Sequence, residues 1–231
     1  MKINIYFSYP NAPITINNQH DVNVFIHKTL GHNKYHDTFS NYSISGLQGG
    51  KYIGNGLIDF QNEQPWLQVS SQDAEFLASL MIALNTTENT LLGMKFDYIV
   101  ADEFNVGNYF DIVYTLSPIL LKDNQSGKKI TFRDDNWLQK LTENCQQKLS
   151  KLPTPIIDDT FSIEIIHQEN AKVKKIIVKE NCWAIASQVV LKINGKKETR
   201  LALYSLGLGN STGSGFGAIQ IKDNRIKKMA F

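Results

Sequence analysis

Histidines cluster near the start of this 231-residue chain. Four of the five lie within 17 residues of one another: His20, His27, His32 and His36. An imidazole titrates close to neutral pH, so one histidine can accept a proton while another donates one. The cluster therefore predicts general acid–base chemistry. The alternative is that some members are ordinary surface side chains, which we expect of His20 and His32.

A metal site is the other chemistry that these side chains could support. His32 and His36 have the i, i+4 spacing that places two ligands on one face of a helix. However, the three residues between them include no glutamate to act as a base, and Gly31 is expected to end the helix before them. The two cysteines, Cys145 and Cys182, are too few for a zinc site or a disulfide framework. We therefore predict no metal and no cofactor, and two reduced thiols in a cytoplasmic protein.

The strongest local signal is the glycine-rich segment 207–217, with the sequence GLGNSTGSGFG. Five glycines in eleven residues indicate positive φ angles or a close approach of the backbone to another group. A dinucleotide-binding loop would need a following helix, a further strand and an acidic residue about 20 positions on, but only 14 residues follow. A Walker loop needs Gly-Lys-Ser/Thr, which is absent. Two hypotheses are left: a wide hairpin loop, or a loop whose backbone N–H groups hold phosphates with the hydroxyls of Ser211, Thr212 and Ser214.

Charge is divided unevenly along the chain. Residues 1–122 carry a net charge of −5 from six lysines and 11 acidic residues, whereas residues 123–231 carry +7 from 18 basic and 11 acidic residues. Such a basic half favours a polyanionic partner, or else a lysine-rich surface exposed to solvent. With 42% hydrophobic residues the chain can bury a core, and no apolar run is long enough to cross a membrane.

The pattern of apolar residues predicts two domains of similar organisation. Residues 1–122 should form a ferredoxin-like unit with the order β-α-β-β-α-β. Its elements are expected at residues 1–9, 21–30, 42–47, 57–60, 66–69, 70–84, 91–100 and 109–121, with Ser70 and Asp73 as a capping box for the second helix. Residues 123–231 should form a second such unit with one helix obscured. Its helix is expected at 134–152 and its strands at 161–166, 174–179, 183–193 and 200–206. The predicted fold class is therefore α+β, with two tandem ferredoxin-like (RRM-like) domains, the second with degenerate helices.

Three segments together resemble a known family, the CRISPR-associated repeat-RNA endoribonucleases, or Cas-six family. Gly207-Leu208-Gly209 and Gly215-Phe216-Gly217 resemble the two ends of its C-terminal glycine signature, with the same spacing. Tyr35-His36-Asp37, followed by residues 42–47, resembles its histidine-bearing segment and the aromatic strand after it. Residues 115–119 resemble the strand that closes its first domain. The resemblance covers the whole chain in order, and it implies the same tandem ferredoxin-like fold.

The resemblance also implies a reaction. His36 matches the position of the family's usual catalytic histidine, and His27 lies where relatives carry a tyrosine or a second histidine. The two would act as base and acid while the 2′-hydroxyl of the RNA attacks the adjacent phosphate, leaving a 2′,3′-cyclic phosphate and a 5′-hydroxyl without a metal ion. The family often adds a lysine a few residues beyond the histidine. Here residues 37–42 contain none, so Lys34 or Lys51 would have to substitute.

With RNA as the partner, the hypothesis of a phosphate-holding loop places the RNA contacts in the glycine-rich segment. The residues predicted to bind RNA are Gly207, Gly209, Asn210, Ser211, Thr212, Gly213, Ser214, Gly215 and Gly217. The predicted partner is CRISPR repeat RNA, with a CRISPR effector complex and a homodimer left open and no membrane. The alternatives are a non-catalytic RNA-binding homologue of the same fold and an unrelated ferredoxin-like protein.

Overall fold

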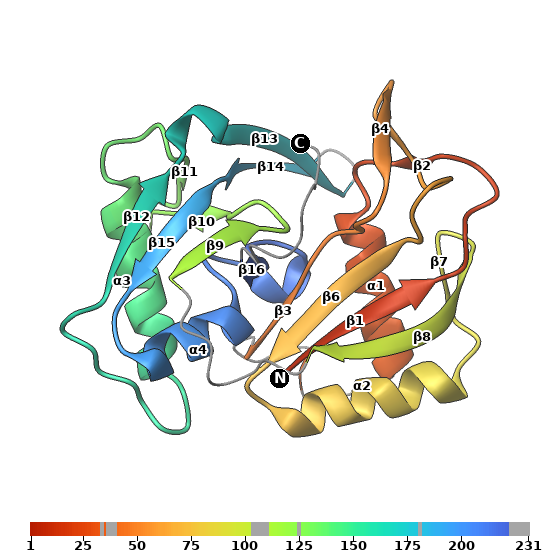
Figure 1. The fold of residues 1–231 in the computed structure, drawn as a ribbon, viewed down its shortest axis with the longest axis horizontal. Coiled ribbons are helices and arrows are strands. Elements are labelled where there is room, and N and C mark those ends of the chain that lie inside the picture. Colours follow the sequence, from red (N-terminus) through yellow and green to blue (C-terminus); the bar gives the residue numbers. More distant parts are fainter. Residues whose placement is uncertain (33–34, 36–40, 103–110, 124–125, 180–181, 222–231) are drawn as a thin grey trace.

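The computed structural model describes residues 1–32, 35, 41–102, 111–123, 126–179 and 182–221, and these form two α/β units side by side (Figure 1). No helix within these ranges is both long enough and apolar enough to cross a membrane. Each unit has its own large cluster of buried hydrophobic side chains. The chain therefore folds around two cores, as a two-domain protein does.

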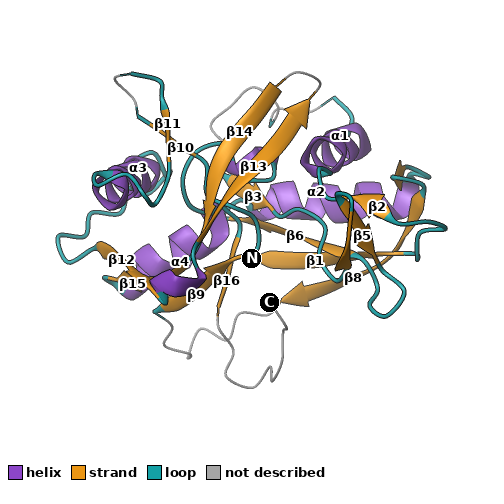
Figure 2. Ribbon diagram, turned by 90° about the horizontal axis from the view of Figure 1, so that it is seen from above, coloured by secondary structure: helices purple, strands orange, loops and turns teal. Residues whose placement is uncertain are grey.

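The first unit has the β-α-β-β-α-β order that the sequence predicts. Its elements are β1 (Lys2–Phe7), α1 (Gln19–Leu30), β3 (Tyr42–Ile44), β6 (Trp66–Ser71), α2 (Ala74–Thr86) and β8 (Met94–Asp102). The strands lie in the order β3-β6-β1-β8 with antiparallel neighbours, which is the ferredoxin-like topology. The short strands are β7 (Thr90–Leu91) at the edge of this sheet, and β2 (Ile14–Thr15), β5 (Leu57–Asp59) and β4 (Lys51–Gly54) in a small separate sheet. Figure 2 shows α1 and α2 together on one side of the five-stranded sheet.

The second helix begins later than the capping-box prediction places it. Asp73 is the N-cap, and its carboxylate accepts hydrogen bonds from the backbone N–H groups of Glu75 and Phe76 at 2.9 and 3.2 Å. Ser70 lies within β6, where it is buried and its Oγ donates to the carbonyl oxygen of Ser205 at 2.9 Å. The capping role predicted for Ser70 is therefore wrong, because this serine still belongs to the strand and bonds to the second unit.

The second unit repeats the topology of the first. Its elements are β9 (Ile112–Thr115), α3 (Trp137–Ser150), β12 (Ser162–Ile166), β15 (Val190–Asn194), α4 (Lys197–Leu206) and β16 (Ile219–Ile221). The strand order β12-β15-β9-β16 corresponds position by position to β3-β6-β1-β8. Two hairpins are inserted: β10 (Leu121–Lys122) with β11 (Lys129–Ile130), and β13 (Lys172–Lys179) with β14 (Cys182–Gln188). The prediction of two tandem ferredoxin-like units is thus confirmed.

The helix that the sequence pattern obscures is α4, so the prediction of a strand over residues 200–206 is wrong. Its buried face follows the i, i+3, i+4, i+7 spacing of a helix. The residues with this spacing are Thr199, Ala202, Leu203 and Leu206, and Arg200, Tyr204 and Ser205 of the same helix are buried as well. The start of α4 is held by Asp158, whose carboxylate accepts hydrogen bonds from the Lys196 N–H and the Thr199 hydroxyl, both at 2.6 Å. Both helices of the second unit are therefore present.

The strand predicted over residues 109–121 pairs in the second sheet and does not close the first. Residues 109 and 110 lie outside the described ranges, and β9 lies between β15 and β16. The first sheet is completed by β8 instead. We therefore propose that the boundary between the units lies between β8 and β9 rather than after residue 122. The single strand predicted over 183–193 is likewise two strands, β14 and β15, which belong to different sheets.

Buried polar contacts join the two units. The Lys2 ammonium of β1 donates to the carbonyl oxygen of Ile219 in β16 at 3.0 Å, and it lies 3.3 Å from the ring centroid of Tyr204 in α4. The Gln68 side chain of β6 donates to the same carbonyl oxygen at 3.2 Å. The contacts of Lys2 and Gln68 fix the first sheet against β16 and α4, and thereby set where the glycine-rich loop meets the first unit.

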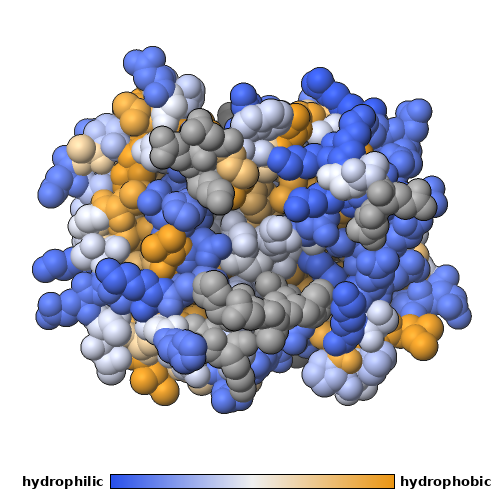
Figure 3. All heavy atoms as spheres, turned by 180° about the vertical axis from the view of Figure 1, so that it is seen from behind, coloured by the Kyte–Doolittle hydropathy of each residue, from blue (hydrophilic) through white to orange (hydrophobic). Residues whose placement is uncertain are grey.

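On the face opposite that of Figure 1, hydrophobic residues form small groups separated by hydrophilic ones (Figure 3).

Candidate active site

His27 lies half-buried toward the C-terminal end of α1. Its Nε2 atom is 3.4 Å from the hydroxyl oxygen of Tyr42 in β3, and the histidine tautomer decides which of the two groups donates. Tyr42 is only 4% exposed, and its ring stacks on Phe76 of α2 with centroids 4.4 Å apart and an interplanar angle of 18°. The tyrosine is thereby fixed, and it orients the imidazole. The other ring nitrogen, Nδ1, is buried, so Nε2 is the atom that would exchange a proton, and a general acid–base role for His27 stays a prediction.

His36, the other predicted catalytic residue, lies outside the residues that the structure describes. Its neighbour Tyr35 is described, and the Tyr35 ring packs edge-on against Phe76, with centroids 4.9 Å apart and planes at 76°. Phe76 therefore contacts both Tyr35 and Tyr42, the partner of His27. The pairing of His36 with His27 stays a prediction.

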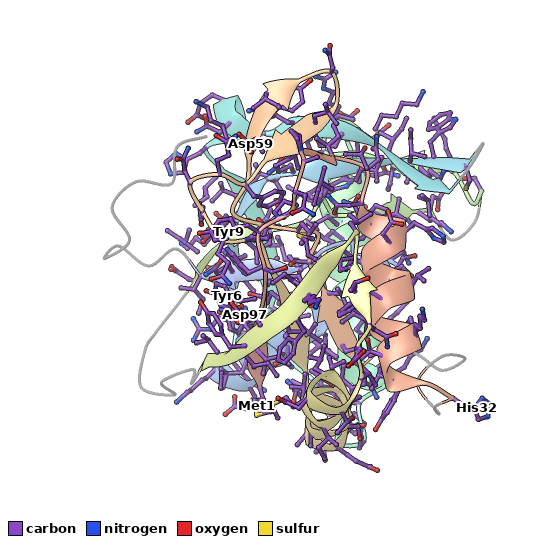
Figure 4. All side chains as sticks on the ribbon, turned by 90° about the vertical axis from the view of Figure 1, so that its right-hand side faces the viewer. Met1, Tyr6, Tyr9, His32, Asp59 and Asp97 are labelled. Atoms are coloured by element: carbon purple, nitrogen blue, oxygen red, sulfur yellow. The ribbon has the colours of Figure 1, made fainter. Side chains whose placement is uncertain are left out.

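The other two histidines of the cluster are exposed. His20 lies in the first turn of α1, and His32 lies beyond the helix, which ends at Gly31 with φ 64°. Figure 4 shows the His32 side chain pointing away from the rest of the molecule. Among the described residues, no three His, Cys, Asp or Glu side chains come together in a way that could hold a metal ion. His20 and His32 are thus placed as the surface side chains that the sequence analysis expects.

The glycine-rich loop lies against the same strand as Tyr42. It follows α4 and includes the short 3₁₀ helix η2 (Thr212–Ser214). The Thr212 hydroxyl donates to the backbone carbonyl oxygen of Tyr42 at 3.0 Å. The loop also faces α1, because a Cβ atom added at Gly215 would lie 3.1 Å from the side chain of Gln19. The loop thus packs against both elements, α1 and β3, that carry the candidate site.

Most of the predicted RNA contacts in this loop are buried. The buried ones are Gly207, Gly209, Thr212, Gly213, Gly215 and Gly217, whereas Asn210 and Ser214 are half-buried and Ser211 is exposed. Backbone N–H groups of the loop bond within the protein: Gly207 donates to Leu203 and Gly217 donates to Pro118. A Cβ atom at Gly217 would lie 1.8 Å from the carbonyl oxygen of Leu208, so no other residue fits there without a shift of the backbone. The glycines therefore serve close packing. Direct contact with RNA stays a prediction, and the three polar residues that are not buried are the best placed for it.

A comparison with protein families identifies the chain. The family model described as CRISPR associated protein Cas6, C-terminal, matches residues 103–221, which is more than half of the chain. The chain belongs to the Cas6 family. The matched residues span β9 to β16, that is, the complete second unit with the glycine-rich loop.

Individual proteins of the Cas6 family are similar over nearly the whole chain. The curated protein "CRISPR-associated endoribonuclease Cas6 1" of Methanocaldococcus jannaschii is 23% identical over 231 aligned residues, which cover 96% of this chain and 89% of that protein. A solved structure described as "CRISPR associated protein Cas6" matches with a TM-score of 0.82 at 18% identity, covering 96% of this chain and 99% of the other. Another, "An RAMP protein binding different RNA substrates", has a TM-score of 0.81 at 18% identity and coverages of 96% and 100%. The two structures show that the shared fold extends over both units.

Lys148 is a further basic residue, beneath the glycine-rich loop of this Cas6-family protein, and no sequence motif points to it. It is buried on α3, and its ammonium donates to the carbonyl oxygen of Gly207 at 3.2 Å. Burial lowers the pKa of Lys148 to about 8, against the opposing influence of Cys145. Burial also raises the pKa of the Cys145 thiol to about 11, which makes it an unreactive core group. A lysine at helical spacing within an apolar stripe is the signal that would have pointed to this support of the loop.

The lysine that the resemblance leads us to expect a few residues beyond His36 is absent from residues 37–42, and Lys34 and Lys51 are its two predicted substitutes. Lys34 lies outside the described residues, and Lys51 lies exposed on β4. A basic element of the second unit does reach α1, since the Ile177 N–H of β13 donates to the side-chain oxygen of Asn17 at 3.3 Å. Four of the eight residues of β13 are lysines. The fold thus brings a cationic strand to the helix that carries His27.

Proposed function

We propose that this protein is an endoribonuclease that cleaves CRISPR repeat RNA, and that it does so without a metal ion. Membership of the Cas6 family supports the proposal, as does the name of the relative from M. jannaschii, an endoribonuclease. The observation that carries it is the placement of His27. Its imidazole is oriented by the buried Tyr42 hydroxyl at the junction of α1, β3 and the glycine-rich loop.

In the proposed reaction the 2′-hydroxyl of one nucleotide attacks the phosphorus that follows it, and the bond to the 5′-oxygen of the next nucleotide breaks. One histidine of the pair His27 and His36 takes the proton of the 2′-hydroxyl, and the other gives a proton to the leaving 5′-oxygen. The products are a 2′,3′-cyclic phosphate and a 5′-hydroxyl. Tyr42 acts here as a positioning residue, because it touches His27 rather than the reacting atoms.

The substrate would lie across both units. Asn210, Ser211 and Ser214 present polar side chains at or near the surface of the glycine-rich loop, beside β3. Residues 123–231 add a net charge of +7, which attracts the phosphates of the RNA. The first unit would thus supply the acid and the base, and the second would hold much of the RNA.

A non-catalytic RNA-binding protein of the same fold is the second candidate. The similarity to the structure described as an RAMP protein binding different RNA substrates favours it. So does the absence of a lysine from residues 37–42. The two candidates differ in one observable property, which is whether bound repeat RNA is cut.

The test is incubation of the protein with repeat RNA from its own genome in the presence of EDTA. We expect cleavage at one position, with a 2′,3′-cyclic phosphate on the upstream product and a 5′-hydroxyl on the downstream product. A 2′-deoxy sugar just upstream of the cut should prevent cleavage, because the nucleophile is then missing. A His27→Ala preparation controls for contaminating ribonuclease. Strict dependence on Mg²⁺, or cutting of the deoxy substrate, would refute the mechanism, and binding without any cutting would favour the second candidate.

A further inference from the structure

The β13–β14 hairpin is a basic element whose two faces differ. β13 has the sequence KVKKIIVK, with four lysines and no acidic residue, and β14, with the sequence CWAIASQ, has no charged residue. The pairing register places Ile177 opposite Trp183 and Ile176 opposite Ala184. The face with Ile176 and Ala184 is buried in a small core with Phe216 of the glycine-rich loop. The face with Ile177 and Trp183 therefore points outward.

Trp183 is exposed, unlike the two other tryptophans of the chain. Its residue surface is 45% exposed, whereas Trp66 and Trp137 are 7% and 1% exposed. Ile177, directly across the strand pair, is also exposed. Tryptophan combines a large apolar surface with a polar edge and is enriched where a partner covers it. The outward face of the hairpin thus has the character of a binding surface.

Two lysines border the Trp183 ring. The Nζ atoms of Lys175 and Lys129 lie 4.8 and 5.3 Å from the ring centroid, and the Lys129 ammonium also donates to the backbone carbonyl oxygen of Trp183. These cation–π contacts hold the indole in place. Although both ammonium groups lie over the ring, Trp183 is still 45% exposed, so part of its surface is open to solvent.

An open aromatic ring bordered by cations is complementary to a nucleotide, whose base stacks and whose phosphates are anionic. We propose that the outward face of the β13–β14 hairpin is a subsite for one unpaired RNA nucleotide, with its base stacked on Trp183 and its adjacent phosphates on Lys129 and Lys175. The inference rests on the proposed function in taking RNA as the substrate, and it adds that the RNA carries an unpaired base at this point. A base inside a duplex is already stacked on both sides, so it would have to be turned out to bind here.

The subsite is attached to the elements of the candidate active site. The hairpin packs on Phe216, and the Ile177 N–H donates to Asn17, just before the first turn of α1. Figure 1 shows the hairpin reaching from the second unit to α1. His27 lies eight residues after Gln19, the first residue of α1, which corresponds to about 12 Å along the helix. The nucleotide on Trp183 is therefore a neighbour of the cut in the chain of the RNA and not one of the two that react.

Tryptophan fluorescence tests the subsite with the intact protein. The probe is a short single-stranded RNA of the repeat sequence, with a 2′-deoxy sugar at the cut so that it stays whole. We expect this RNA to quench part of the fluorescence, and the same strand in a duplex with its complement to quench much less. Trp183→Phe should abolish the quenching, because Trp66 and Trp137 are buried. Binding without quenching in the wild type, or full quenching in Trp183→Phe, would overturn the proposal.

Affinity provides an independent measurement. In Trp183→Leu the single-stranded RNA should bind about 5- to 150-fold more weakly, the range for one lost stacking contact, and Trp183→Phe should lose less because a ring is kept. Lys129→Gln and Lys175→Gln should each reduce the log–log salt slope by about 0.7. The controls are Ile157→Ala, an exposed apolar residue elsewhere in the second unit, and Lys95→Gln, an exposed lysine of the first unit. Wild-type affinity in a folded Trp183→Leu variant would overturn the subsite.

Failure of the subsite can be told apart from failure of the proposed function. The two are scored by separate measurements on the wild type: quenching of the fluorescence reports the subsite, and cutting of the unmodified repeat RNA reports the proposed function. If the wild type shows quenching by RNA but never cuts it, the subsite stands and the proposed function fails. If Trp183→Leu loses self-association in sedimentation experiments and keeps its RNA affinity, the face is a protein interface and the subsite is wrong.

Discussion

The two ferredoxin-like units share a strand order but carry different side chains. The first has the histidine cluster, and the net charge over residues 1–122 is −5. The second has two inserted hairpins and the glycine-rich loop, and the net charge over residues 123–231 is +7. The difference teaches that repetition of a fold does not repeat its site, because function depends on the residues placed on the scaffold. In our account the acid–base groups belong to the first unit and most RNA-holding surfaces to the second.

The glycine-rich loop is the point where the two sets of residues meet. Its Thr212 hydroxyl donates to the backbone of Tyr42, the residue that orients His27. A Cβ atom at Gly207 would lie 2.8 Å from the Cβ of Ser43 on the same strand. Disturbing the loop should therefore affect both the acid–base residues of the first unit and the RNA-holding surfaces of the second.

The largest effect is expected from a side chain placed inside the loop. In Gly217→Ala the added Cβ would lie 1.8 Å from the Leu208 carbonyl oxygen, at φ 64°. A left-handed backbone costs a non-glycine residue about 1–2 kcal/mol, and overpacking adds about 1–3 kcal/mol. We expect the free energy of unfolding, measured with urea, to fall by about 2–5 kcal/mol. Gly127→Ala has nearly the same φ, 66°, but open space around its Cβ, so it should lose only the backbone part. Equal losses in the two variants would mean that the loop is not packed as described.

A smaller loss is expected where α4 begins. The Asp158 carboxylate accepts four hydrogen bonds, from the N–H and hydroxyl of Thr160, the Lys196 N–H and the Thr199 hydroxyl. Burial alone would raise the pKa of this carboxyl, but the hydrogen bonds hold the pKa well below its usual range. The carboxylate therefore stabilises the fold above the unfolded-state pKa of about 3.9, and this contribution is lost as the pH falls through the lower folded-state pKa.

Asp158→Asn should accordingly lower the free energy of unfolding by about 1–3 kcal/mol at pH 7, because some of the donors lose their acceptor. The difference from the wild type should shrink as the pH is lowered below about 4. Asp159→Asn changes the neighbouring exposed carboxylate and is the matched control, with little expected effect. If the free energy of unfolding of Asp158→Asn differed from that of the wild type by the same amount at every pH, the charge of the carboxylate would not contribute to stability.

The periodicity of apolar residues was sufficient to predict the helices that have long apolar stripes. The helices predicted at 21–30 and 134–152 are α1 and α3; the end of α1 is as predicted, and the other three ends differ by two or three residues. α4 was mistaken for a strand because seven residues of mixed apolar pattern fit either period, and its start depends on Asp158, which is distant in the chain. β9 was assigned to the wrong sheet because alternation does not say which distant strand will pair with it.

The candidate site was predictable in residue type more than in arrangement. The resemblance to the family led to His27 within the histidine cluster, but its contact with Tyr42 joins α1 and β3, and no local pattern encodes that contact. A glycine-rich loop has the same composition whether its backbone faces a phosphate or packs against another strand. Its burial between the two units therefore could not be foreseen. Lys148 was missed because lysines are almost always exposed, although its spacing from Leu141 and Cys145 places it within the apolar stripe of α3.

The smallest effect is expected from Tyr42→Phe, which removes the hydroxyl beside His27 and keeps the ring stacked on Phe76. Single-turnover cleavage should slow by about 2- to 10-fold, which corresponds to the net free energy of one lost hydrogen bond. The pH profile of the rate should also shift. RNA affinity and thermal stability should stay close to those of the wild type. Tyr98→Phe also removes a tyrosine hydroxyl, but one that bonds to Gln64 at an exposed position, and should leave the rate unchanged. An unaltered rate and pH profile in Tyr42→Phe would remove the positioning role.

The most direct test of the division between the units is a paired measurement on His27→Ala, with cleavage rate and RNA affinity determined on the same preparation. We predict a fall of about 10²-fold or more in the single-turnover rate and an almost unchanged Kd, with the same result for His36→Ala. His20→Ala, exposed on the same helix, should cleave like the wild type. A folded His27→Ala variant that cleaves repeat RNA at the wild-type rate would contradict the account.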